Sequence, residues 1–158
     1  MPKRTFQFIL LLTASWCVMT FTHELGHLVG GWIGGGTLRV AELRPWHLSY
    51  SIFEPDPRPL VTLWAGPLLG VVVPIVVALL ARHRVMWFTA DFCLLANGVY
   101  LALAWIAGDR HLDTPRLLAN GAYPAAVAIY CLLTIGFGYV RFRRDCIRFF
   151  AHRSDEHV

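Results

Sequence analysis

Four long apolar stretches limit what this 158-residue chain can fold into. They cover residues 6–33, 60–81, 85–107 and 123–140. A helix of about 20 apolar residues crosses a bilayer, and the whole chain is 56% hydrophobic and only 15% charged. This composition is typical of small integral membrane proteins. We therefore predict an all-α membrane protein with about four transmembrane helices, which form one membrane-embedded domain over residues 1–158.

The segment between the first two stretches has a different pattern. Residues 38–40 and 48–52 alternate between apolar and polar side chains on either side of Arg44-Pro45-Trp46. Period-two alternation around a turn predicts a short β-hairpin, here within residues 37–53. Gly34-Gly35-Gly36 end the first helix, and prolines at positions 55, 57 and 59 end the second strand.

The first apolar stretch contains the motif His23-Glu24-Leu25-Gly26-His27. Residues four apart share one face of a helix, so His23 and His27 can offer two imidazoles to one metal ion. Glu24, one position round the helix, can reach a water bound to that metal. The alternative is two snorkelling histidines and a buried Glu. Because an unpaired Glu in a bilayer is costly, the motif favours a zinc metalloprotease centre.

A third metal ligand has to come from elsewhere in the chain. Catalytic zinc usually has three protein ligands, and the third histidine of the extended soluble motif HExxHxxGxxH is replaced by Ile33. The motif lies near the end of the first helix, on the membrane face named here side B, opposite the N-terminus on side A. The next two spans return the chain to side B, at a segment with Asp109, His111 and Asp113. Either aspartate can complete the site, and His111 can support it.

These motifs resemble those of the site-2 protease family of intramembrane zinc metallopeptidases. That family carries HExxH in one membrane helix and an LDG-type motif two helices later, where this chain has Leu112-Asp113-Thr114. Ala65-Gly66-Pro67-Leu68 also resembles a short sequence of the family's intervening helix. Thr114 stands where the family has glycine, and the Asn-x-x-Pro that precedes the aspartate in the family is absent.

The resemblance implies a site and a reaction. Zinc is expected to be held by His23, His27 and Asp113, with Asp109 as the alternative third ligand. Glu24 is expected to activate zinc-bound water, which hydrolyses a peptide bond in or near a transmembrane segment of a membrane-anchored protein. The hairpin can hold an unwound substrate as an added strand.

The role of Asn97 is open at this point. Its side chain can bind the substrate backbone, or it can join two helices.

Two other functions fit fewer of these features. A catalytically silent scaffold, or pseudoprotease, would bind a partner helix in the same groove but has no need for a buried Glu24. A metal carrier would need ionisable groups along several helices, and the second and fourth stretches have none. The net charge of +4 favours contact with anionic lipid over nucleic acid. Expected partners are a membrane-protein substrate, the lipid bilayer, and a second copy of the chain or a regulatory membrane protein.

The remaining charges bear on topology. We expect Asp91 to pair with Arg82 or Arg84, and residues 141–158 to form a basic tail that is either interfacial or solvated. The 14 Lys and Arg residues divide nine to five in favour of side A, which predicts a cytoplasmic side A. The family resemblance implies the opposite orientation, in a bacterial cell membrane.

Overall fold

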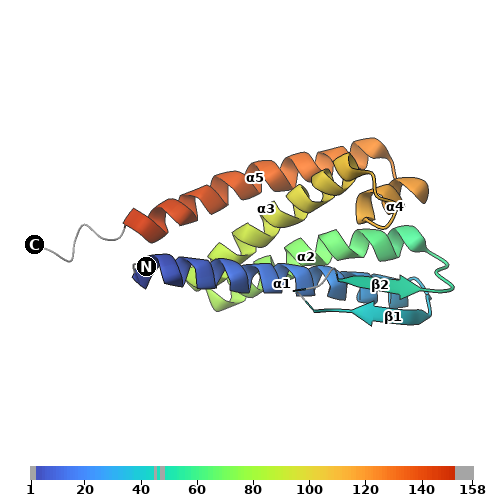
Figure 1. Cartoon of the computed structure of the whole chain (residues 1–158), viewed down its shortest axis with the longest axis horizontal. Coiled ribbons are helices and arrows are strands. Elements are labelled where there is room, and N and C mark those ends of the chain that lie inside the picture. Colours follow the sequence, from blue (N-terminus) through green and yellow to red (C-terminus); the bar gives the residue numbers. More distant parts are fainter. Residues whose placement is uncertain (1–2, 45, 47–48, 152–158) are drawn as a thin grey trace, which may run out of the picture.

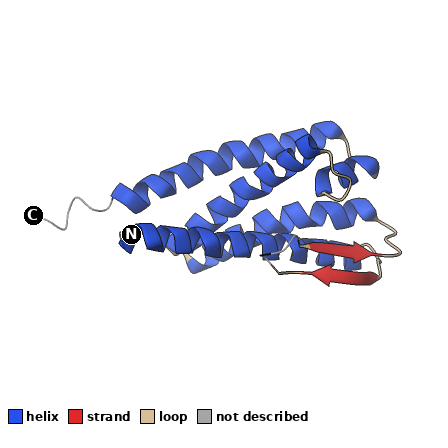
Figure 2. Cartoon of the chain, in the orientation of Figure 1, coloured by secondary structure: helices blue, strands red, loops and turns tan. Residues whose placement is uncertain are grey.

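The computed structural model describes residues 3–44, 46 and 49–151. Over these residues the chain forms four long helices, one short helix and a two-stranded sheet (Figure 1, Figure 2). In chain order the elements are α1 (Lys3–Ile33), β1 (Leu38–Glu42), β2 (Tyr50–Phe53), α2 (Pro59–Ala81), α3 (Arg84–Ala107), α4 (Asp113–Ala119) and α5 (Pro124–Ala151). α1, α2, α3 and α5 are each long and apolar enough to cross a membrane. The predicted fold class is therefore confirmed.

The long helices turn many large apolar side chains outward. Leu80 of α2, Ile106 of α3 and Leu132 of α5 are 79%, 82% and 73% exposed. A water-soluble surface seldom exposes so many large apolar side chains, whereas a bilayer would cover them. The fold is that of a multi-pass membrane protein.

The predicted β-hairpin is present after α1. β1 and β2 pair antiparallel, with Val40 opposite Ile52 and Glu42 opposite Tyr50. Tyr50 and Ile52 are exposed, so the apolar face of the alternating pattern points away from the protein. The predicted strand residues 47 and 48 lie outside the described residues.

The other face of β2 lies against the C-terminal half of α1 (Figure 1). Ser51 and Phe53 are buried there. A methyl group on Gly31 would come within 2.3 Å of the Phe53 ring, so the ring rests on bare helix backbone. This contact aligns the hairpin with α1 and brings Ser51 to the level of the HExxH motif.

α1 and α2 cross at very short range beside the motif. A methyl group on Gly26 would lie 2.3 Å from the Ala65 carbonyl oxygen, and one on Gly30 would lie 2.4 Å from the Ala65 side chain. Small residues allow such an approach between helices in lipid. The glycines therefore hold α2 close enough for its backbone to touch His27.

The segment after α3 contains a short helix, α4, that the sequence analysis did not predict. Its Leu117 is fully buried and packs with Leu63 of α2, Leu101 of α3 and Val127 of α5. This cluster joins the side-B ends of the helices. It also places the first residue of α4, Asp113, over the interior of the bundle instead of in a solvated loop.

At side A, aromatic rings join the start of α1 to the end of α5. The Phe8 ring centroid lies 5.3 Å from that of Phe149 and 4.9 Å from that of Phe150. α5 continues through this cluster to Ala151. The helix thus runs past residue 140, where we predicted the fourth span to end, and the predicted basic tail is helical as far as residue 151; residues 152–158 lie outside the described residues.

Asp91 of α3 is buried in the same half of the molecule. It is 1% exposed and accepts a hydrogen bond of 2.6 Å from Nε of Arg141 on α5. The predicted pairing with Arg82 or Arg84 is wrong. Arg84 precedes Asp91 by two turns of the same helix, about 10 Å along its axis, whereas α5 packs directly against α3.

Candidate metal centre

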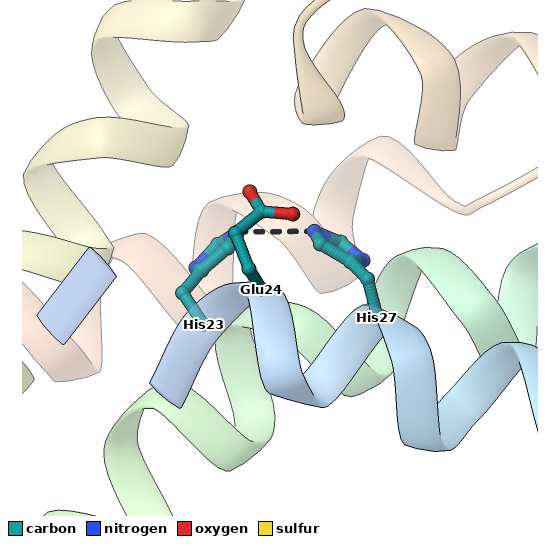
Figure 3. A group of neighbouring side chains, drawn as sticks. All are labelled: His23, Glu24 and His27. Atoms are coloured by element: carbon teal, nitrogen blue, oxygen red, sulfur yellow. Dashed lines mark hydrogen bonds between the residues drawn. The ribbon is translucent and has the colours of Figure 1, made fainter. Parts of the chain in front are cut away.

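The motif residues lie on the inward side of α1. His23, Glu24 and His27 are 5%, 7% and 5% exposed. The two Nε2 atoms are 3.1 Å apart, and the Glu24 carboxylate lies beside both rings (Figure 3). One potential ligand atom from each of the three residues lies within 4.8 Å of the others. The i, i+4 spacing brings the two imidazoles together as predicted.

Asp113 lies within hydrogen-bond distance of both histidines. Its Oδ2 atom is 2.8 Å from Nε2 of His23 and 3.3 Å from Nε2 of His27. Asp113 is 5% exposed and is the first residue of α4. Three potential ligand atoms, two nitrogens and one oxygen, therefore surround one point.

The alternative carboxylate, Asp109, takes no part in this cluster. It is exposed, and its Oδ1 accepts a hydrogen bond from the backbone N–H of His111. His111 is exposed as well. Both residues belong to the turn between α3 and α4.

The hydrogen bonds to Nδ1 determine which nitrogen of each imidazole carries the proton. Nδ1 of His23 lies 2.7 Å from Oδ1 of Asn97, and Nδ1 of His27 lies 2.9 Å from the Thr62 carbonyl oxygen. The amide nitrogen of Asn97 donates to the Cys93 carbonyl, which orients its oxygen towards His23. Because both partners are oxygens that only accept, each Nδ1 must donate. In the neutral rings, Nε2 then presents a lone pair to the centre.

Three acceptor atoms facing one another repel unless a positive charge lies among them. Burial raises the pKa of the Asp113 carboxyl, but the positive charge of a protonated His27 and the hydrogen bonds with His23 and His27 outweigh that effect and lower it. A metal ion or added protons must balance the group.

The donor set fits zinc. Zinc binds imidazole nitrogen and carboxylate oxygen, and catalytic zinc sites use three protein ligands and leave one position open. Bonds of about 2.0–2.1 Å at tetrahedral angles separate ligand atoms by roughly 3.3–3.4 Å. The observed separations of 2.8, 3.1 and 3.3 Å are close to that spacing. Small outward shifts of side chains would suffice to admit the ion.

Glu24 is held differently from Asp113. Its Oε2 atom accepts a hydrogen bond of 3.2 Å from the Ser51 hydroxyl of β2. The carboxylate is thus tied to the hairpin and not to the imidazoles. This places it between the imidazoles and β2.

Asn97 is fully buried and links α3 to α1 through His23. The helix-joining role left open by the sequence is present in the structure. A contact between Asn97 and a substrate backbone stays a prediction.

Several residues around the site were not predicted to be functional. They are Ser51, which bonds to Glu24; Thr62, whose carbonyl bonds to His27; Tyr100, whose ring packs edge-on against His23 at 5.3 Å; and Thr114, which bonds to α3. Two act through ordinary hydroxyl groups and one through its backbone. Only Thr114, next to a predicted ligand, stood at a position that the motif comparison had singled out.

Comparisons of the chain with protein-family models, with curated proteins and with solved structures gave no match.

Proposed function

We propose that this protein is a zinc-dependent intramembrane metalloendopeptidase. The observation that carries the proposal is the convergence of His23 Nε2, His27 Nε2 and Asp113 Oδ2 within 3.3 Å of one another, with both Nδ1 atoms engaged elsewhere. The resemblance of the motifs to the site-2 protease family supports the same assignment. A multi-pass protein of a bacterial cell membrane is the setting that this resemblance favours.

Each residue has a distinct part in the proposed reaction. His23, His27 and Asp113 hold the zinc ion. When bound, zinc acts as a Lewis acid that makes water more acidic and polarises a peptide carbonyl. Glu24 accepts a proton from the attacking water and delivers it to the leaving amine nitrogen. The Ser51 hydroxyl keeps the Glu24 carboxylate oriented towards the reacting atoms.

The position of the site among apolar helices favours a transmembrane segment as the substrate. A peptide bond in a transmembrane helix is shielded by its own hydrogen bonds, so the helix must unwind before attack. A two-stranded sheet has outer edges, and an open sheet edge is costly in lipid. Adding an extended substrate segment to the hairpin would satisfy both sets of backbone groups.

Proline substitutions along β2 (Tyr50–Phe53) test this mode of binding. A proline removes one backbone donor, so cleavage should fall at positions whose N–H faces the substrate, while the zinc content stays the same. Unchanged cleavage at every position would argue against strand addition.

The zinc content of purified protein tests the metal site. We expect about one zinc per wild-type chain, retained in Asp109→Ala and lost in Asp113→Ala. Loss of zinc only in Asp109→Ala would identify Asp109 as the third ligand. Failure of the wild type to bind zinc after gentle purification and zinc addition would instead favour the pseudoprotease.

Substitution of Glu24 separates binding from catalysis. Glu24→Gln keeps the size of the side chain but cannot accept the proton, so it should retain zinc and lose cleavage of a membrane-anchored substrate. Full cleavage by this variant would refute the assigned role of Glu24.

A further inference from the structure

The aspartate of the proposed zinc site lies at the start of a very short helix. α4 has only seven residues, and isolated helices of that length are unstable in water. Leu112 at its N-cap position makes no side-chain capping bond. Something outside α4 must therefore fix the direction of Asp113, and the affinity for a metal depends on that direction.

Thr114, directly after Asp113, makes a tertiary hydrogen bond beside it. Its hydroxyl donates to the Leu101 carbonyl oxygen of α3 over 2.7 Å. Thr114 is 0% exposed, so water cannot replace the bond. A buried hydroxyl between two helices has few other partners, and its loss would leave Asp113 with one anchor fewer.

The receiving helix is the one that orients the first histidine. Asn97 and Leu101 of α3 are one turn apart; the side chain of the first bonds to His23, and the backbone of the second bonds to Thr114. α3 thus bonds, from adjacent turns, to a proposed ligand of α1 and to the residue that follows the proposed ligand of α4. Leu117 anchors the other end of α4 in the core but lies one turn beyond Asp113.

We propose that Thr114 is a positioning residue that fixes Asp113 against His23 and His27 and thereby sets the affinity for the metal. This inference rests on the proposed zinc site. Removal of hydrogen-bond partners behind metal ligands typically weakens metal binding 10–100-fold, and a similar loss is expected here.

The test compares Thr114→Val with Thr114→Ser and with Thr134→Val. Valine keeps the shape of threonine and removes the hydroxyl, whereas serine keeps the hydroxyl. Thr134 is a matched control, because its hydroxyl is also buried and donates over 2.7 Å to a carbonyl, that of Tyr130 in its own helix. The zinc dissociation constant is measured by competition with a chelator, and the thermal midpoint of each metal-free protein is measured alongside.

We expect Thr114→Val to raise the zinc dissociation constant 10–100-fold, with Thr114→Ser and Thr134→Val within about threefold of wild type. A value for Thr114→Val within threefold of wild type would overturn the inference. So would an equal loss of affinity in Thr134→Val, since the effect would then be one of general stability. Failure of the wild type itself to bind zinc would refute the proposed function instead, so the two failures are distinguishable.

If Thr114→Val does not fold, the thermal midpoints and affinities of Thr114→Ser and Thr114→Ala decide. Affinity that follows the presence of the hydroxyl supports the inference, and equal affinity in the two contradicts it.

Discussion

Asp91 and Asp113 are both carboxylates buried among apolar helices, but their surroundings differ. Asp91 meets a guanidinium, that of Arg141, at 2.6 Å. Asp113 meets two imidazoles whose protons are directed elsewhere. The first carboxylate has its countercharge within the protein. The second is met by two imidazoles instead of a guanidinium, so the cluster can take up a cation from outside.

The comparison separates structural from functional buried charge. A carboxylate paired with Arg is held in one geometry by a permanent charge and contributes to helix packing. A carboxylate paired with two histidines can exchange protons for a metal ion. Burial and residue type are the same in both cases, so only the partners distinguish the roles.

The largest expected effect comes from removing the countercharge of Asp91. Arg141→Met leaves a buried carboxylate unpaired, which should lower the free energy of unfolding by about 3 kcal/mol, at the low end for a broken buried pair because Arg141 is partly exposed. Equilibrium unfolding in mixed micelles measures it. Arg143→Met, an exposed change on the same helix, is the control. If Arg141→Met lowers the free energy of unfolding as little as Arg143→Met does, the pairing with Arg141 does not stabilise the protein.

Removal of the metal should lower the stability only of proteins that retain Asp113. With free zinc buffered at about 100 times its dissociation constant, binding stabilises the folded protein by roughly 2.7 kcal/mol. A chelator should therefore destabilise wild type and Asp91→Asn equally and leave Asp113→Ala unchanged. The shift of the unfolding transition on chelator addition reports this. An equal shift in Asp113→Ala would mean that zinc binds elsewhere.

Asn97→Leu tests whether the hydrogen bond to Asn97 keeps the His23 proton on Nδ1. The change leaves Nδ1 without its acceptor, so zinc affinity should fall about 10–100-fold. Asn120→Leu, whose side chain bonds only to the exposed last turn of α4, should bind zinc as wild type does. Competition titration gives both constants, and similar values for the two variants would count against an orienting role.

The smallest effect concerns Glu24, the third buried carboxylate. Ser51→Ala removes its hydrogen bond, worth about 1 kcal/mol, so the cleavage rate should fall about fivefold with zinc content unchanged. Ser49→Ala removes a hydroxyl that bonds to the Arg44 carbonyl instead and should cleave at the wild-type rate. If Ser51→Ala cleaved at the same rate as Ser49→Ala, the contact between the hairpin and Glu24 would not contribute to catalysis.

The sequence predicted those features that depend on local pattern. Four apolar stretches gave four long helices, Gly34 to Gly36 ended α1, and the spacing of His23 and His27 brought their rings together. It failed where tertiary packing decides. Arg141 reaches Asp91 only because α5 lies beside α3, and the continuation of α5 past residue 140 to Ala151 accompanies aromatic packing against α1.

The environment of the candidate site was the least predictable part. The sequence named His23, Glu24, His27 and Asp113, because these are residue types with a recognised chemistry. It gave no indication of Ser51 or of the Thr62 carbonyl, since a serine or a backbone oxygen becomes a specific partner only when a distant segment arrives beside it.

The separation of 90 residues between His23 and Asp113 has a consequence during synthesis. At about 5–20 residues per second, the ribosome would need roughly 5–18 s after making His23 to reach Asp113. Throughout that interval α1 carries two imidazoles and a carboxyl into the membrane without the aspartate that completes the cluster. The nascent helix must therefore be received by a translocation channel or an assembly factor that tolerates polar groups, or it must wait at the membrane surface until α3 and α4 have been made.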